Sequence, residues 1–226
     1  MELVFSCTNE SLQAIVKGLS LNEGDIVLAV GGSGDQPFAI LEHSGVIAVD
    51  KNPEQVKFIQ ERAKALESNN YEGFFSEDKR GSGEIIHFLK RLRESRRNYF
   101  DEERLRKIQG RLQYLKLYNG DIFEVAEKEE FTKVYLSNTL SYERPGTDEI
   151  KKNLDLVALR LPDGGLVYVA DHDFLASMFV RFVSRKKNND LKITSFLSPY
   201  LTLDEELTLK AREYEDVWRP AVYRKC

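Results

Sequence analysis

The sequence predicts an α/β fold of the Rossmann-like, doubly wound type, with a mostly parallel sheet of about seven strands. Two apolar runs predict it, one at 26–30 that ends in the glycine-rich loop 31–34 and one at 46–49 that ends in Asp50. Each run is followed by residues with helical spacing, which is the third observation. Because crossover connections are right-handed, the two strands are expected to be parallel neighbours in one half of such a sheet.

This first unit also carries signals for where its helices begin. Asp35 is expected to cap the helix after the glycine loop, and Pro37 suits the first turn because its φ is already helical. Asn52 and Pro53 are expected to do the same for the helix after the second strand.

The region 72–110 interrupts the alternation of strands and helices and is predicted to be a helical insertion. Alternation then resumes. The predicted later strands are 112–118, 131–136 and 166–170, the predicted helices are 122–127 and 148–161, and an antiparallel pair at 193–197 and 217–223 is expected to close one edge.

Length and composition favour a single folded domain over residues 1–226. The chain is 42% hydrophobic and 31% charged, which excludes the disordered and fibrous classes. Its two cysteines, Cys7 and Cys226, form no CxxC pair, so neither a zinc site nor a disulfide framework is indicated. No stretch approaches the roughly 18 apolar residues of a membrane span. We therefore expect a cytoplasmic protein, with membrane association at most peripheral.

The insertion is rich in basic residues, with eleven lysines and arginines between Lys79 and Arg111. A solvated helical face is the ordinary explanation of such a run, and a surface that meets an anion is the alternative. Nucleic acid is thus a minor option among the partners, and the sequence leaves the oligomeric state open.

The glycine loop and Asp50 together indicate a cofactor that contains a nucleoside. Glycines let the backbone approach a ligand closely, and an acid at the end of the second strand can accept hydrogen bonds from ribose hydroxyls. NAD fits poorly, because Pro37 stands where the third glycine of G-x-G-x-x-G belongs. A negative Asp35 would repel phosphate but suit an ammonium, which S-adenosylmethionine carries.

These residues, with Asn119-Gly120-Asp121-Ile122 after the third strand, resemble the class I S-adenosylmethionine-dependent methyltransferase superfamily over roughly residues 20 to 171. The resemblance implies that glycines of the loop line the cofactor, that Asp50 holds the ribose, and that Asp121 and Ile122 meet the adenine. The expected cofactor-binding set is Gly31, Gly32, Ser33, Gly34, Asp35, Gln36, Asp50, Lys51, Asp121, Ile122 and Ser137.

Three strings resemble a narrower family, the betaine-lipid synthase A proteins: the loop and helix 31–41, the Asp-x-Asn-Pro-x-Gln string within 48–55, and Leu136-Ser137-Asn138. This likeness implies transfer of the 3-amino-3-carboxypropyl group of S-adenosylmethionine to a small-molecule or lipid acceptor. Members of that family are markedly longer. The resemblance therefore applies better to the part that binds S-adenosylmethionine, the group donor, than to the part that binds the acceptor. Methyl transfer, a noncatalytic cofactor-binding module and a nicotinamide-dependent oxidoreductase remain the alternatives.

The reacting groups are expected at the carboxyl end of the sheet. Asn138, Tyr142 and His172 are the predicted catalytic residues there. His172 stands between two aspartates, but the other histidines, His43 and His87, are far away in the sequence, so no metal site is predicted.

Overall fold

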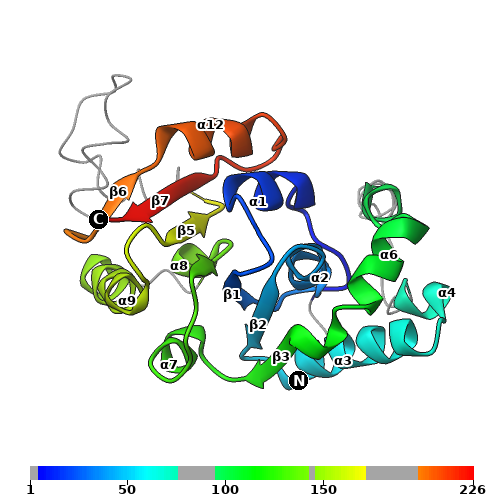
Figure 1. The fold of residues 1–226 in the computed structure, drawn as a ribbon. Helices are drawn as coiled ribbons and strands as arrows, with labels where there is room; N and C mark the ends of the chain where they lie inside the picture. The colour runs from blue at the N-terminus through cyan, green and yellow to red at the C-terminus, as the bar shows by residue number, and fades with distance from the viewer. Residues whose placement is uncertain (1–4, 76–94, 143–145, 172–197) are drawn as a thin grey trace, which may run out of the picture.

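The computed structural model describes residues 5–75, 95–142, 146–171 and 198–226. In these residues a seven-stranded sheet runs in the order β3-β2-β1-β4-β5-β7-β6 (Figure 1). The first five strands are parallel, and β7 is antiparallel to both β5 and β6. The strands are β1 (Ile26–Val30), β2 (Gly45–Asp50), β3 (Leu115–Asn119), β4 (Lys133–Tyr135), β5 (Leu166–Val169), β6 (Leu201–Leu203) and β7 (Ala221–Lys225).

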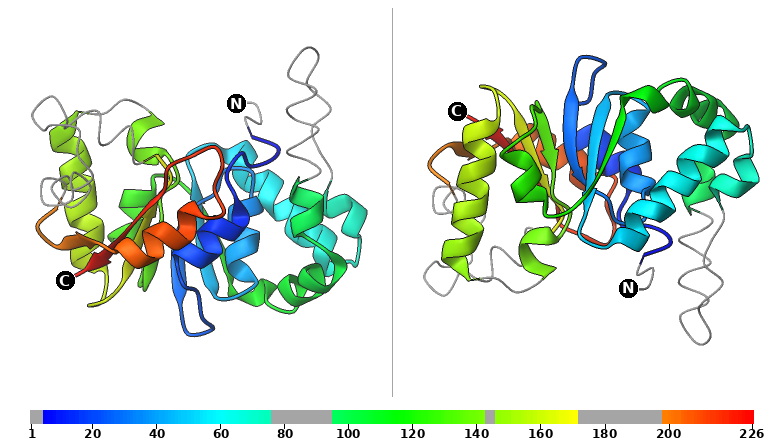
Figure 2. Two further views of the ribbon diagram at one scale, coloured as in Figure 1. Left: turned by 90° about the horizontal axis from the view of Figure 1, so that it is seen from above. Right: turned by 90° about the horizontal axis from the view of Figure 1, so that it is seen from below.

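Helices cover both faces of the sheet, which gives three layers (Figures 1 and 2). Helices α1, α2, α3 and α12 pack on one face, where α1 and α12 lie side by side, and α7 and α9 pack on the other. The described helices are α1 (Leu12–Gly18), α2 (Asp35–Leu41), α3 (Pro53–Glu67), α4 (Tyr71–Phe74), α6 (Glu102–Gln109), α7 (Ile122–Ala126), α8 (Thr139–Tyr142), α9 (Thr147–Arg160) and α12 (Glu205–Arg212).

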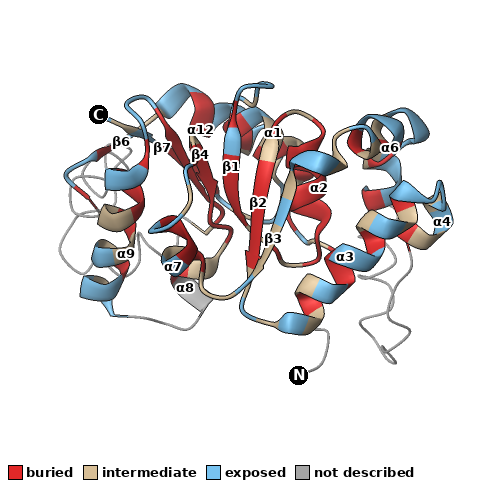
Figure 3. Cartoon of the chain, turned by 60° about the horizontal axis from the view of Figure 1, so that its bottom comes forward, coloured by how far each residue is buried: buried red, intermediate tan, exposed pale blue. Residues whose placement is uncertain are grey.

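The direction of winding reverses between β1 and β4. The chain runs outward from β1 to β2 and β3, then returns to place β4 on the other side of β1, with Ala29 in register with both Ala48 and Tyr135. Such a switch point separates the loops that leave two neighbouring strands, and ligands of open α/β sheets bind there, at the carboxyl ends. The strands around it are largely buried, as Figure 3 shows.

Local sequence explains how the first unit forms. Strand β1 has the predicted bounds, and its three central residues are fully buried between helices, as expected for a continuous apolar run. The Asn52 side chain accepts a hydrogen bond from the Glu54 backbone, and Pro53 opens α3, so the predicted start of this helix is confirmed.

The predicted cap of α2 is wrong. Gly34 occupies the N-cap with a φ of +85°, and Asp35 is the first helical residue. A side-chain cap is dispensable there because every residue of α2 is buried, so packing stabilises this helix. Helix α1 was not predicted, although Leu12, Ile15 and Leu19 recur at helical spacing and are buried.

The edges of the sheet also differ from expectation. Residues 112–114 form a 3₁₀ turn before β3, so the strand begins three residues later than predicted. The antiparallel closing pair exists, but it consists of β6 at 201–203 and β7 at 221–225. The segment 193–197, predicted as its partner strand, lies outside the described residues.

The insertion is helical where the structure describes it, in α4, at 95–99 and in α6. Its described basic side chains meet acids of the same chain: Arg104 and Lys107 both pair with Glu42, and Arg106 pairs with Glu102. Within the described ranges, no helix has the length and apolar character needed to cross a membrane.

Candidate functional site

The glycine loop leaves the carboxyl end of β1 and packs against the end of β2. The Gly31 N–H donates to the Val49 carbonyl at 2.7 Å, and a Cβ at Gly31 would lie 3.1 Å from the Cβ of Asp50. Gly32 has a φ of +49°, and the nearest atom to a Cβ there would be 3.7 Å away. The loop is therefore tight on its protein side at Gly31, while Gly32 leaves room beside the backbone.

Asp50 receives two backbone hydrogen bonds and retains capacity for more. Its Oδ2 accepts from Gly32 N–H and its Oδ1 accepts from Asn52 N–H, both at 2.9 Å. A carboxylate has about four acceptor positions, so roughly two remain for ligand hydroxyls. Burial raises the pKa of Asp50, against the lowering effect of these two N–H groups. The half-buried carboxylate fits the role predicted for it, holding two neighbouring ribose hydroxyls.

The Asp-x-Asn-Pro-x-Gln string holds the glycine loop in place. After Asp50 and the cap Asn52, the Gln55 amide donates to the carbonyl of Gly32 and to that of Phe5, and its oxygen accepts from the Phe5 N–H at 2.9 Å. Gln55 is 1% exposed. The string therefore connects β2, the loop and the segment at 5–10.

The Asp35 carboxylate is paired inside the protein, contrary to the expectation that its charge would meet a ligand ammonium. This side chain is fully buried, and its carboxylate lies 2.7 Å from the guanidinium of Arg62, also fully buried, and accepts from Thr8 N–H at 2.9 Å. Burial lowers the pKa of Arg62 to about 10, so the arginine stays charged at neutral pH. The charge of Asp35 is compensated inside the protein and does not face a ligand ammonium.

The two other polar members of the loop and helix start also bind within the protein. The Ser33 hydroxyl donates to Asp35 at 3.1 Å, and the Gln36 amide donates to the Thr8 hydroxyl at 2.8 Å. Both side chains are buried. Their contacts fix the loop and the segment 5–10 relative to each other, so any contact that they make with a cofactor stays a prediction.

The end of β3 lies beside Asp50, and its residues have structural partners. Asp121 caps α7 by accepting from Phe123 N–H at 2.7 Å and pairs with Lys51 at 3.1 Å. Asn119 donates to the carbonyls of Asp50 and Lys51, which ties the two strand ends together. Ile122 is 5% exposed and belongs to the core under α7.

The chain is similar to several solved structures, three of which follow. TrmN from Thermus thermophilus gives a TM-score of 0.52 at 13% identity over 95% of this chain and 48% of that one, so the chain spans about half of its length. The N-methyltransferase NodS from Bradyrhizobium japonicum gives 0.49 at 10% identity, covering 94% of this chain and 92% of that one. A putative methyltransferase from Streptococcus mutans in complex with SAH gives 0.48 at 8% identity, covering 95% of each chain.

In the described residues five parallel strands are followed by an antiparallel β7, which lies between β5 and β6. The fold is the Rossmann-like, class I methyltransferase-like one that the sequence predicts. No family model matches the sequence, and no curated protein matches it. The likeness is one of fold, and the chemistry has to be argued from the site.

In this class I fold the carboxyl end of β4 carries Ser137 and Asn138, as predicted. Ser137 has a φ of +53°, a conformation that costs a non-glycine residue of order 1 kcal/mol or more and that clusters at functional sites. Of the other predicted catalytic residues, Tyr142 ends α8 without a described side chain, and His172 lies outside the described residues.

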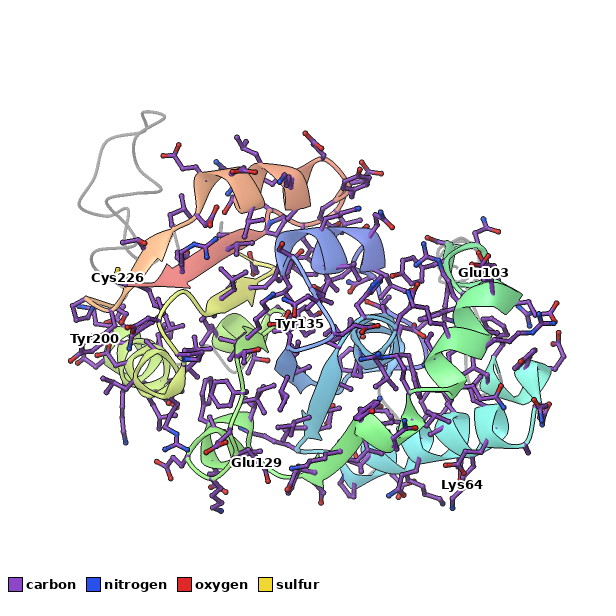
Figure 4. All side chains as sticks on the ribbon, in the orientation of Figure 1. Lys64, Glu103, Glu129, Tyr135, Tyr200 and Cys226 are labelled. Carbon is purple, nitrogen blue, oxygen red and sulfur yellow. The ribbon has the colours of Figure 1, made fainter. Side chains whose placement is uncertain are left out.

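Glu10 is the residue that the sequence pattern did not reveal. It is 7% exposed and accepts a short hydrogen bond from the Ser137 hydroxyl. Tyr135 on β4 and Tyr168 on β5 are register partners and lie in the region of Glu10. Figure 4 shows Tyr135 near the middle of the molecule. The one signal in the sequence was local: an acid stands directly before Ser11, which caps the apolar helix α1.

Proposed function

We propose that the protein is an S-adenosylmethionine-dependent transferase and that the group it transfers is methyl. One observation carries the cofactor: the glycine loop and Asp50 are joined by the Gly32 N–H to Oδ2 bond at the carboxyl ends of β1 and β2, within a class I fold. Asp50 keeps free acceptor capacity there, and Gly32 keeps space beside its backbone. A site for a nucleoside-containing ligand explains both features better than a strand-to-helix turn without a ligand does.

In this proposal the protein supplies position rather than strong acid or metal chemistry. Asp50 holds the ribose hydroxyls, and Gly31 and Gly32 let the backbone lie close to the ligand. The bound cofactor supplies an alkyl group on a sulfonium, whose leaving group is a neutral thioether. What remains for the chain's own residues is to align an acceptor with that group and to take up the acceptor's proton.

Methyl transfer is preferred here over 3-amino-3-carboxypropyl transfer. Of the three strings that suggested the latter, the more specific one runs from Asp50 to Gln55. Each of its defined residues has a structural role, since Asp50 and Gln55 bind Gly32 while Asn52 and Pro53 begin α3. The string therefore supports a loop conformation, which either reaction can use. The fold supports the methyltransferase interpretation, and carboxypropyl transfer is kept as the second candidate.

A small molecule is the acceptor class that we propose. The basic residues of the insertion were the reason to consider an anionic polymer or surface as a partner. The described ones contact carbonyl and carboxylate groups of the protein itself. Arg96 is 2% exposed and donates to the Ser6 and Phe75 carbonyls, and Arg97 lies 3.4 Å from Glu72. These contacts favour a structured helical surface over a nucleic-acid interface.

Isothermal titration with S-adenosylmethionine, S-adenosylhomocysteine, methylthioadenosine and NAD tests the proposal. We expect both adenosyl amino acids to bind and NAD to give no heat. An Asp50→Asn variant, which keeps one acceptor oxygen for the loop, should bind S-adenosylmethionine about tenfold more weakly or worse, as expected for the loss of a charged hydrogen-bonding partner. Glu54→Gln is the matched control, because it changes an acid at the same turn whose side chain has no hydrogen bond or ion pair with the loop among the described residues.

The same titrations separate the two transfers. Tighter binding of S-adenosylhomocysteine than of methylthioadenosine agrees with methyl transfer, because it is the product of that reaction. The reverse preference would favour carboxypropyl transfer. If neither S-adenosylmethionine nor S-adenosylhomocysteine binds, the transferase proposal is wrong.

A further inference from the structure

A buried polar cluster surrounds Glu10 on the α1 face of the sheet. The Glu10 Oε1 accepts from Ser137, while its Oε2 has no hydrogen-bond partner among the described residues. The hydroxyls of Tyr135 and Tyr168 are likewise buried and unpaired within the described part of the chain. An unsatisfied buried acceptor of this kind is costly and calls for an explanation, a catalytic role being one.

The cluster lies at the carboxyl end of β4, where the reacting groups are expected. Ser137 lies two residues beyond β4, next to the switch point, and residues 8–10 connect it to the glycine loop. The Thr8 hydroxyl accepts from both the Glu10 N–H at 3.0 Å and the Gln36 amide at 2.8 Å, and the Thr8 N–H binds Asp35. The chain therefore leads from the proposed cofactor loop directly to the Glu10 carboxyl.

Glu10 is also held rigidly. The next residue, Ser11, caps α1, and its N–H donates to Glu215 at 2.8 Å. At the other end of α1, Gly18 lets the helix approach closely, since a Cβ there would lie 2.9 Å from the ring of Tyr168 and 3.0 Å from Ala211 on α12. The cap at the start of the helix and the close packing at its end fix the backbone from which the carboxyl projects.

The groups that face Glu10 leave it with a neutral form near physiological pH. Burial and, less strongly, the charge of Glu215 raise the pKa of Glu10, the hydroxyls of Ser137 and Tyr135 beside its carboxyl lower it, and the net result is a pKa of about 7. The charge of Glu10 in turn raises the pKa of Tyr135 and of Tyr168, after the larger effect of their own burial. An acid that exchanges a proton at the working pH is suited to proton transfer.

We propose that Glu10 is the catalytic base: its Oε2 takes the proton of the acceptor while Ser137 fixes Oε1. This rests on the proposed function. The acceptor atom forms a bond to the transferred carbon, the C–S bond breaks with its electron pair left on sulfur, and the acceptor's proton moves to Glu10. The proton later passes to solvent, which restores the carboxylate, so that no further reactant is needed.

The sulfonium charge provides a test that needs no acceptor. If Glu10 faces the transferred group, bound S-adenosylmethionine should lower its pKa and expel a proton, whereas neutral-sulfur S-adenosylhomocysteine should not. The protons released are counted by titration calorimetry in buffers of different ionisation enthalpy near pH 7. We expect the two ligands to differ by up to about half a proton, because Glu10 is then about half protonated.

Variants assign the difference to this residue. Glu10→Gln should abolish the difference while both ligands still bind, and Glu215→Gln, the matched control that removes the neighbouring carboxylate, should retain it. If Glu10→Gln does not fold, Ser137→Ala serves instead: loss of its hydrogen bond should raise the pH at which the difference is largest. An unchanged pH in that variant would overturn the proposal.

The outcomes show separately whether Glu10 is the base and whether the proposed function is correct. Equal proton counts for both ligands overturn the role of Glu10 but leave cofactor binding intact. An equal and nonzero release would place Glu10 at the ammonium that both ligands share, which also contradicts its assignment as the base. Absence of binding by either ligand would refute the proposed function itself.

Discussion

Replacing Glu10 by glutamine is expected to change how the stability of the protein depends on pH. Glutamine keeps the shape of the neutral acid and cannot ionise, so it mimics the form that burial favours. In the folded protein the pKa of Glu10 is raised from 4.5 to about 7. The folded state thus binds this proton more tightly than the unfolded state does, and the resulting stabilisation is fully present below pH 4.5 and lost as pH rises through 7.

The size of the effect follows from the two pKa values. Each pH unit between them is worth about 1.4 kcal/mol, so the interval corresponds to about 3 kcal/mol. Glu10 is 7% exposed, and little solvent screening reduces this figure. Between about pH 4.5 and about pH 8 the free energy of unfolding of the natural protein should therefore fall by about 3 kcal/mol relative to that of Glu10→Gln.

Urea unfolding of both proteins at half-unit steps of pH measures this quantity. The difference between the two free energies of unfolding cancels the titration of groups that do not interact with Glu10. If the free energy of unfolding falls with urea concentration at the same slope in both proteins, both expose similar surface on unfolding. A difference that stays constant across this pH range would refute the reasoning, because it would mean that Glu10 titrates alike in both states.

Two further predictions concern the glycine loop. Gly34→Ala should destabilise the protein by about 2 kcal/mol or more in urea unfolding, since its Cβ would lie 2.9 Å from Ile59 at a φ of +85°, while Gly120→Ala, which meets no atom within 4 Å, should stay within about 0.5 kcal/mol. Arg62→Met should cost about 3–5 kcal/mol because it removes the nearer of the two buried cations beside Asp35 and leaves only Arg96 at 4.0 Å, and adding Asp35→Asn should recover part of the loss. A small effect of Arg62→Met alone would contradict the buried pair.

The parts of the fold that local chemistry determines were predictable from the sequence. Strand β1 and the start of α3 have the predicted positions because an unbroken apolar run, and a cap followed by proline, act within a few residues. The failures have distant causes. Asp35 looks like a helix cap in its own neighbourhood, but Arg62 on the following helix and Arg96 in the insertion make it a buried ion.

The candidate site divides in the same way. The glycine loop and Asp50 were found because both stand at the ends of recognisable strands, and they do meet in space. Glu10 was missed because its partner, Ser137, is 127 positions away in the sequence, and the contact requires α1 to cross back over the sheet. No periodic pattern of residues near Glu10 predicts that contact. A buried acid before a helix cap was the only local trace.

The position of α1 has a consequence for how the molecule is assembled during synthesis. The segment 5–10 is synthesised before the sheet, yet its anchors are added much later: Ser137 comes 127 residues after Glu10, and Glu215 comes 204 residues after Ser11, beyond α12. Contacts so distant in sequence close late, because the entropy of a long loop must be lost before they form. Nascent chains that carry only the first strands therefore hold the glycine loop without Glu10 in place, and any ligand that they capture meets an unfinished proton acceptor.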